Sequence, residues 1–321
     1  MTKRRRGTVY IGIDVGGTNL KAGLVDEKGS ILAVERRPLG TFQGPEPFAE
    51  TLAELAKAVL RKGGAAPEDI AYVGMGIPGA VEGGKILYTC NIPMRDVPLS
   101  DLFRRRLDLP VLLGNDADCA AVGEWACGAG RGTRNFIIIT LGTGVGGGFI
   151  LNGRLYAGGG MVGEVGHMVI QRDGLPCNCG RRGCWEAYAS ATALARQTQA
   201  AMAAHPESLL HAVAEELGGV EGRTAFLAAE RGDAAAKEVC RNYVGYLATG
   251  VTNLVNILQP EVLAVGGGVA GAPDALLMDP LRRLVEAECY PRHANKLPRI
   301  LRAELGNDAG IIGAALLGTV I

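Results

Sequence analysis

The alternation of apolar and polar residues predicts a strand-rich beginning of the chain. Apolar runs separated by turn residues predict a three-stranded meander. Its strands are expected over 8–14, 20–25 and 31–34. Helical spacing of apolar residues follows, and then two more strands and another helix. These elements are expected over 47–60 (helix), 70–77 and 111–113 (strands) and 117–128 (helix).

The same pattern then begins again. A strand over 135–140 leads into a glycine-rich turn over 141–148 and a return strand over 149–151. The segment after Asp14 and the segment after Leu141 therefore form equivalent hairpins about 130 residues apart, a weak internal repeat. The later part is more helical, with a helix over 239–258, a strand over 261–265 and a final helix over 309–319.

Strands and helices mixed in this order predict an α/β protein with two layered domains. We expect a small N-terminal domain over 1–128 and a large domain over 129–305. The last helix, about 306–321, is expected to pack back onto the first domain.

Composition and charge narrow the choice of partners. The 321 residues are 48% hydrophobic, which is ample for a large core. Lys+Arg and Asp+Glu both number 33, so neither nucleic acid nor a membrane surface is favoured as partner. The basic run Lys3–Arg6 is most simply a solvated arm. No apolar stretch is long enough for a membrane span or a signal peptide, and we expect a cytoplasmic protein.

Glycine-rich turns are the first candidate for chemistry. The 48 glycines gather where strands end, and a turn without side chains can aim several backbone N–H groups at a phosphate chain. Ordinary tight turns would look the same singly, but three of them together favour nucleotide binding. The candidate residues are Gly16, Gly17, Thr18, Gly142, Thr143, Gly144, Gly267 and Gly268. Asp14 is expected to help hold the hydration shell of Mg²⁺. The patterns of a Walker-type loop and of a dinucleotide fold do not occur.

A carboxylate follows the strand at 111–113. Asp116, after Asn115, stands at a strand end and a helix start, where a general base for an alcohol would be well placed. Asp and Asn are also favoured helix caps, so capping is the competing interpretation. The two residues could share the two roles.

One histidine and three cysteines have the spacing of a metal site. His167, Cys177, Cys179 and Cys184 form a Cys₃His set, which predicts a four-coordinate structural Zn²⁺. Reduced, partly buried cysteines are the alternative. Eight cysteines in a cytosolic chain do not indicate a disulfide framework, and those outside this set are expected to fill the core.

Two glutamates flank the predicted zinc set. Glu164 comes three residues before His167 and Glu186 two residues after Cys184. Carboxylates recognise the vicinal hydroxyls of a sugar by accepting two hydrogen bonds, and a zinc knot would fix the backbone that presents them. Each glutamate taken alone is equally compatible with an ordinary surface position.

Six segments, in this order, resemble the ROK family of sugar kinases and repressors, and within it the bacterial glucokinases. They span nearly the whole chain. They are Ile13–Lys21, Gly76–Gly79, Gly114–Ala117, Leu141–Gly148, Gly163–His167 and Cys177–Glu186.

This resemblance implies an actin-like, ribonuclease-H-like fold with ATP in a cleft between two domains. It implies that ATP phosphorylates the 6-hydroxyl of glucose, with Asp116 as catalytic base, and that the protein is a homodimer. The implied sugar-binding residues are Gly79, Asn91, Asn115, Asp116, Glu164, His167 and Glu186. Cys90 replaces the family's proline before Asn91. His167 would be zinc ligand and sugar ligand at once.

Other members of the family offer alternatives. Kinases for N-acetylmannosamine, N-acetylglucosamine, fructose or allose would use compatible residues. A sugar-responsive repressor would carry a helix-turn-helix ahead of the core. Asp14 lies thirteen residues from the start, which leaves no room for it here, so we expect an enzyme.

Overall fold

The computed structural model describes residues 8–89, 92–158 and 161–320. Contacts between Cα atoms divide the chain into two compact units. Unit 1 comprises Met1–Phe136, Gly148–Gly163 and Glu304–Ile321, and unit 2 comprises Ile137–Gly147 and Glu164–Ala303. This grouping follows contacts alone, and the domain limits expected from the sequence stay a prediction.

Unit 1 is built on a five-stranded sheet with the order β3-β2-β1-β4-β8. The predicted meander forms its antiparallel half. β4 pairs in parallel with both β1 and β8. The strands are β1 (Val9–Val15), β2 (Asn19–Asp26), β3 (Ile31–Pro38), β4 (Ile70–Ile77) and β8 (Val111–Asn115). A small second sheet consists of β5 (Ala80–Glu82), β6 (Lys85–Tyr88) and β7 (Arg95–Val97).

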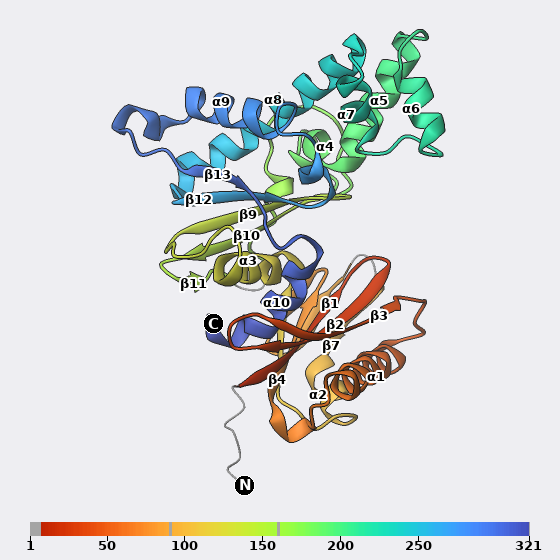
Figure 1. Ribbon diagram of the computed structural model, residues 1–321, viewed down its shortest axis with the longest axis vertical. Coiled ribbons are helices and arrows are strands. Elements are labelled where there is room, and N and C mark those ends of the chain that lie inside the picture. Colours follow the sequence, from red (N-terminus) through yellow and green to blue (C-terminus); the bar gives the residue numbers. More distant parts are fainter. Residues whose placement is uncertain (1–7, 90–91, 159–160, 321) are drawn as a thin grey trace. The chain divides into compact units, whose positions relative to one another are not determined.

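Helices cover both faces of this sheet. α1 (Pro45–Gly63) and α2 (Leu99–Arg104) lie on one face, and α3 (Asp116–Cys127) and α10 (Ala309–Leu316) on the other (Figure 1). Alternation along β1 explains this arrangement. Ile11 and Ile13 join the core under α1, whereas Tyr10 packs against a cluster that includes Ile311 of α10. Helices therefore cover both faces of the sheet, as its parallel half, β1, β4 and β8, requires.

A second five-stranded sheet has the order β11-β10-β9-β12-β13. It starts, like the first, from a hairpin around a glycine turn, and its strand order repeats that of the first sheet. The internal repeat predicted from the sequence is confirmed in this order of strands. The strands are β9 (Phe136–Leu141), β10 (Val145–Leu151), β11 (Arg154–Leu155), β12 (Val262–Gly266) and β13 (Arg299–Arg302).

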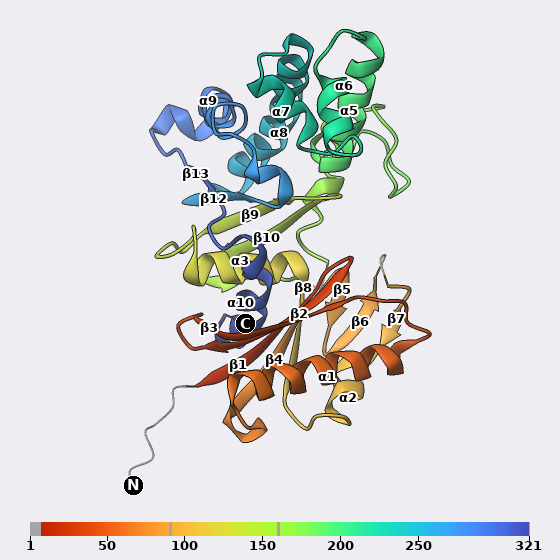
Figure 2. The ribbon, with the colours of Figure 1, turned by 45° about the vertical axis from the view of Figure 1, so that its right-hand side comes forward.

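The helices of unit 2 gather on one face of the β9–β13 sheet (Figure 2). α8 is the longest, and its side chains Tyr243, Leu247 and Val251 are fully buried. The helices are α4 (Glu186–Ala189), α5 (Ala191–Ala204), α6 (Leu210–Glu216), α7 (Thr224–Glu230), α8 (Ala234–Leu258) and α9 (Met278–Glu288). No helix in the described part of the chain combines the length and apolar character that a bilayer span requires.

One predicted element was wrong in its extent. The sequence suggested a glycine turn over 141–148, but only Gly142–Gly144 lies outside the strands, because β10 begins at Val145. Glycines within β10 pair as strand residues and are not part of a phosphate-binding turn. The final helix is also shorter than expected, since its α-helical part ends at Leu316.

Candidate functional site

In unit 1 the candidate residues collect at one edge of the sheet, where the parallel strands β1, β4 and β8 end. Asp14 is the register partner of Gly76, and Gly76 is the partner of Gly114. Adjacent strands lie about 4.8 Å apart, so Asp14 and Gly114 are about 10 Å apart across two spacings. Asn115 and Asp116 come directly after Gly114. Residues a hundred positions apart in the sequence thus meet where α/β sheets commonly bind ligands.

Asp14 is a mostly buried carboxylate with one cationic neighbour. Its Oδ2 lies 3.9 Å from Nζ of Lys21, and both side chains are about four-fifths buried. Burial raises the pKa of Asp14, and the Lys21 ammonium partly opposes that rise. Gly310 faces the carboxylate so closely that a Cβ there would lie 2.8–3.0 Å from it. A desolvated carboxylate that Lys21 neutralises in part is suited to a metal ion or its bound water.

The turn between β1 and β2 carries the other nucleotide candidates of unit 1. The backbone N–H of Gly16 donates to Asn19 O (2.9 Å), which closes the turn. Gly17 and Thr18 are exposed at its tip. The carbonyl of Thr18 accepts the N–H of Leu39, and this bond ties the turn to the segment after β3.

Asn115 takes the helix-capping role that the sequence left open between Asn115 and Asp116. Asn115 is the N-cap of α3, and its Oδ1 accepts the N–H groups of Ala117 (2.8 Å) and Asp118 (3.4 Å). Its Nδ2 donates to Gly79 O (3.0 Å). Asp116 occupies the first turn of the helix with its side chain exposed. The N–H of Ala117 also lies 3.0 Å from Asp116 Oδ1, so both side chains contact the start of α3, and Asn115 accepts the larger number of N–H groups there.

A cavity of about 190 Å³ adjoins these residues within unit 1. It is lined by Val81, Glu82, Gly83, Leu113, Gly114, Asn115, Asp118, Leu155, Ala157, Gly158 and Leu317. Gly79 stands beside it through its bond to Asn115. Asn91, another predicted sugar-site residue, lies outside the described residues.

In unit 2 the glycine turn Gly142–Gly144 is tied to the sugar candidate Glu186. The N–H of Val145 donates to Glu186 Oε2 (3.0 Å). A Cβ on Gly144 would lie 2.2 Å from the same oxygen, so glycine is required for this approach. The carboxylate is half-buried and uses one oxygen on the hairpin. The sequence did not predict this bond, because the two partners are 41 positions apart.

Further bonds hold the same turn. The N–H of Ala191 donates to Gly142 O (2.8 Å), and the Thr192 hydroxyl donates to Thr143 O (2.9 Å). Gly267 lies against the end of β9, where a Cβ would come within 2.4–2.7 Å of the backbone of Leu141. The turn containing Gly267 and Gly268 is thereby placed next to Gly142–Gly144. Unit 2 presents two adjacent glycine turns, as a phosphate-binding backbone requires.

The remaining sugar candidates, Glu164 and His167, lie close together. Glu164 Oε2 is 3.8 Å from His167 Nε2, and the glutamate is exposed. The other ring nitrogen of His167, Nδ1, is 3.6 Å from the Cys177 sulfur. The imidazole therefore has one nitrogen toward the cysteines and one toward a carboxylate.

The four predicted zinc ligands come together in unit 2. The ligand atoms of His167, Cys177, Cys179 and Cys184 all lie within 4.8 Å of one another. Cys179 Sγ and Cys184 Sγ are 3.6 Å apart. Bonds of about 2.3 Å to a tetrahedral zinc would separate two sulfurs by about 3.8 Å, so the donor set fits the ion. The backbone N–H of Arg181 lowers the pKa of the Cys179 thiol, which favours the thiolate that a metal needs.

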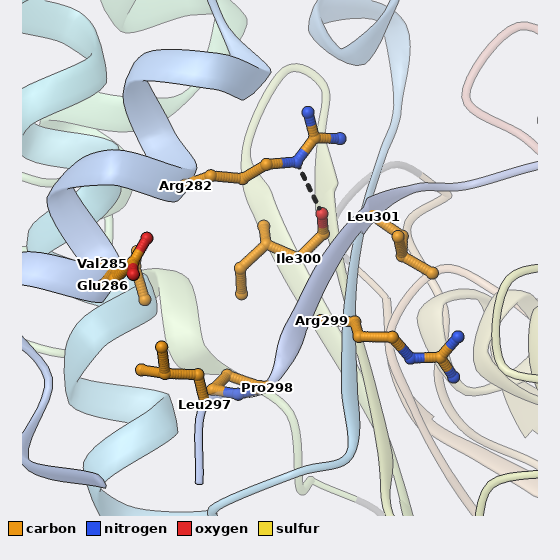
Figure 3. A pocket seen from close by; sticks show the side chains of 8 residues that line it. All are labelled: Arg282, Val285, Glu286, Leu297, Pro298, Arg299, Ile300 and Leu301. Carbon is orange, nitrogen blue, oxygen red and sulfur yellow. Dashed lines mark hydrogen bonds between the residues drawn. The ribbon is translucent and has the colours of Figure 1, made fainter. Parts of the chain in front are cut away.

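A groove of about 320 Å³ elsewhere in unit 2 contains none of the predicted site residues. It lies between α9 and β13, with Arg282, Glu286 and Arg299 among its lining (Figure 3). Nε of Arg282 donates to Ile300 O (2.9 Å). This bond occupies a carbonyl of the edge strand, and the groove is not part of the candidate site.

The geometry at the strand ends agrees with a comparison to known proteins. The family description that matches residues 10–319 is the ROK family. The chain belongs to the ROK family. A glucokinase of Halalkalibacterium halodurans is 40% identical over 312 residues, which cover 96% of this chain and 94% of that protein.

Two solved structures of ROK proteins have the same fold. A ROK family glucokinase from Streptomyces griseus, solved with glucose and AMPPNP, superposes with a TM-score of 0.81 and 35% identity. The match covers 96% of this chain and 98% of that one. A ROK hexokinase from Thermus thermophilus gives a TM-score of 0.78 and 33% identity, with 96% and 97% covered. The predicted α/β, actin-like ATPase fold is confirmed.

Proposed function

We propose that this ROK protein is an ATP-dependent glucokinase, which transfers the γ-phosphoryl group of ATP to the 6-hydroxyl of glucose. The observation that carries the proposal is the 40% identity to a glucokinase over 96% of the chain. An exposed carboxylate at the start of a capped helix, as such a reaction needs, supports it.

Unit 1 supplies the base. Asp116 accepts the proton of the attacking hydroxyl as the oxygen bonds to the γ-phosphorus and the bond to ADP breaks. Asn115 holds the start of α3 and, with Gly79, binds the sugar. Asp14 and the turn Gly16–Thr18 face the triphosphate. Asp14 would help hold Mg²⁺, which would supply positive charge to offset the charge that develops on the phosphoryl oxygens.

Unit 2 supplies the recognition of sugar and nucleotide. Glu164, His167 and Glu186 accept and donate hydrogen bonds to the sugar hydroxyls, and Asn91 of unit 1 completes the set. Gly142, Thr143, Gly144, Gly267 and Gly268 offer backbone N–H groups to the nucleotide phosphates. Because Glu186 also accepts the N–H of Val145, this side chain connects the proposed sugar-binding residues to the glycine turn Gly142–Gly144.

Zn²⁺ has a structural role in this proposal. Four protein ligands leave no open coordination position for a substrate. His167 would hold the ion together with Cys177, Cys179 and Cys184, and because its Nδ1 faces the cysteines, Nε2 would remain for a hydrogen bond to the sugar. The segment fixed in this way would hold Glu164 and Glu186 in place.

A coupled assay of the purified protein tests the function. Glucose, N-acetylmannosamine, N-acetylglucosamine, fructose and allose are each offered with ATP and Mg²⁺. We expect kcat/KM to be highest for glucose by at least about tenfold, the discrimination that 1.4 kcal/mol of differential binding gives. A higher value for another sugar would replace glucose in the proposal, and turnover of no sugar would reject kinase activity. The implied homodimer stays a prediction, which light scattering of the eluted protein can test.

A further inference from the structure

Glu124, in the middle of α3, is a glutamate with no exposed surface. Glutamate is almost never fully buried unless its charge is matched by partners. The residue lies eight positions after Asp116 on the same helix. None of the roles assigned above uses it.

Its carboxylate is satisfied by backbone N–H groups from two separate loops. Oε2 accepts the N–H of Ala129 (2.9 Å) and of Glu304 (3.0 Å), and Oε1 accepts that of Leu305 (2.7 Å). Two of these donors are 180 and 181 positions away in the sequence. Hydrogen bonds to an ionised acceptor are about twice as strong as neutral ones, so Glu124 holds both loops firmly.

The N–H groups of Glu304 and Leu305 belong to the first residues after the chain returns from unit 2 to unit 1. Ala303 is the last residue of unit 2, and its N–H donates to Val265 O (2.9 Å) in that unit's sheet. The next N–H, of Glu304, belongs to the bond with Glu124 in unit 1. The N–H of Ala303 is thus bound in unit 2 and the N–H of Glu304 in unit 1. The backbone torsions that can change lie between these two N–H groups.

A second side chain of unit 1 holds the same returning segment. Nζ of Lys21, the neighbour of Asp14, donates to Asn307 O (3.1 Å). The segment from Glu304 to Asn307 is therefore fixed to unit 1 by an anion at its start and by a cation at its end. A hinge is typically a few residues next to a rigidly held segment, and here those residues are 303–304, just before the fixed segment.

We propose that Glu124 is a positioning residue that confines the pivot of this crossing to residues 303–304 and fixes it to the helix that begins at Asp116. The inference rests on the proposed function, because it assumes that sugar binding moves unit 2 relative to the catalytic helix. Without the carboxylate, backbone torsions after residue 304 can change as well. The sugar-bound state then has to order more residues, which costs more conformational entropy.

The test compares Glu124→Gln with Tyr72→Phe. The amide keeps the shape of the side chain but places an NH₂ group against backbone donors. Tyr72 is the matched control in unit 1, since its hydroxyl donates to Ala315 O (2.5 Å) and accepts the N–H of Gly318 (3.0 Å), away from the crossing. Both variants are expected to lower Tm. Only Glu124→Gln should raise the KM for glucose, by about tenfold for one lost charge-assisted bond, with kcat changed less.

Gly128→Ala provides a second route if Glu124→Gln does not fold. A Cβ on Gly128 would lie 2.1 Å from Glu124 Oε2, so it displaces the carboxylate and keeps the charge. The same rise in glucose KM, smaller in size, is expected. A Glu124→Gln protein that loses stability as Tyr72→Phe does but keeps glucose KM within twofold of the wild type would overturn the proposal.

Amide hydrogen exchange tests the anchor without relying on activity. In the wild type the N–H groups of Glu304 and Leu305 should be protected equally with and without glucose. In the Glu124→Gln or Gly128→Ala protein they should exchange faster, whereas the N–H of Ala303 should not. Rapid exchange at 304–305 in the wild type would refute the anchor. A wild type that phosphorylates no hexose but keeps this protection would reject the proposed function and leave the anchor standing.

Discussion

The two glycine hairpins of this protein are alike in sequence and different in their surroundings. The β1–β2 turn has its tip exposed, and the charged residues Asp14 and Lys21 stand at its base. The β9–β10 turn is bound by Glu186, Ala191 and Thr192. The first hairpin has an exposed tip and a charged base, as the proposed contact with a phosphate chain would need, and the second is held by hydrogen bonds from three neighbouring residues.

This difference teaches that a repeated motif need not repeat its function. Both hairpins can offer backbone N–H groups to phosphates, but Asp14 forms an ion pair with Lys21, whereas Glu186 accepts a backbone N–H of its hairpin and is proposed to bind sugar as well. Substitutions in the two hairpins should therefore separate activity from stability in different ways.

Asp116→Asn should give the largest effect. Loss of the general base is expected to lower kcat by about 10²–10⁴-fold, because an amide cannot accept the proton. Glucose binding, measured by calorimetry, should change little, since Asn115 keeps its cap on α3. Turnover near the wild-type rate would remove Asp116 from its role and with it the assignment of the chemistry to unit 1.

Asp14→Asn and Glu186→Gln test the difference between the β1–β2 and β9–β10 hairpins directly. Both should reduce kcat/KM by at least about tenfold, as expected for a lost charged contact of about 1.5–3 kcal/mol. Only Glu186→Gln should lower the stability. Glu186→Gln weakens the bond to Val145 and should lower Tm, whereas Asp14→Asn removes a desolvated charge and should leave Tm unchanged or higher.

The pH dependence of Asp14 has a defined sign. Burial raises its pKa in the folded protein above 3.8, so the folded state holds the proton more tightly than the unfolded state. The free energy of unfolding of the wild type, relative to Asp14→Asn, should fall as the pH rises from about 3.8 through the raised pKa and be constant above it. Denaturant titrations of both proteins across acidic pH measure this difference, and a rise with pH would contradict the burial of the ionised carboxylate.

Removal of zinc should give an intermediate effect on unit 2. Chelation, or Cys179→Ser, is expected to lower Tm by several degrees, because each kcal/mol lost shifts Tm by about 2–4 °C in a domain of this size. The KM for glucose should rise with it, since Glu164, His167 and Glu186 lose their support. Metal analysis of the purified protein should find one zinc per chain; a zinc-free, fully stable protein would favour simple reduced cysteines.

Gly144→Ala should give the smallest effect. The added Cβ meets the flexible end of Glu186 rather than backbone, so the carboxylate can move aside at a small cost in Tm. The KM for glucose should rise by a few-fold, in step with a partly lost hydrogen bond of about 1 kcal/mol. If the KM for ATP rises instead and that for glucose does not, the turn serves the nucleotide alone.

The sequence by itself determined what depends on neighbours along the chain. It predicted the meander, a helix cap at Asn115 or Asp116, and the Cys₃His set, because turn chemistry, helix caps and closely spaced ligands act over a few residues. It overextended the second glycine turn, since glycine pairs in a strand as readily as it bends, and composition does not distinguish the two.

Only the tertiary structure decided the partners that lie far apart in the sequence. Three such contacts depend on how strands and helices pack. They are the approach of Gly310 to Asp14, the hydrogen bond from Val145 to Glu186, and the hydrogen bonds from Glu304 and Leu305 to Glu124. The physical reason is burial. A buried carboxylate needs hydrogen-bond donors or a cation near it, and the fold determines which groups these are. The residues next to Glu124 or Asp14 in the sequence do not indicate these partners.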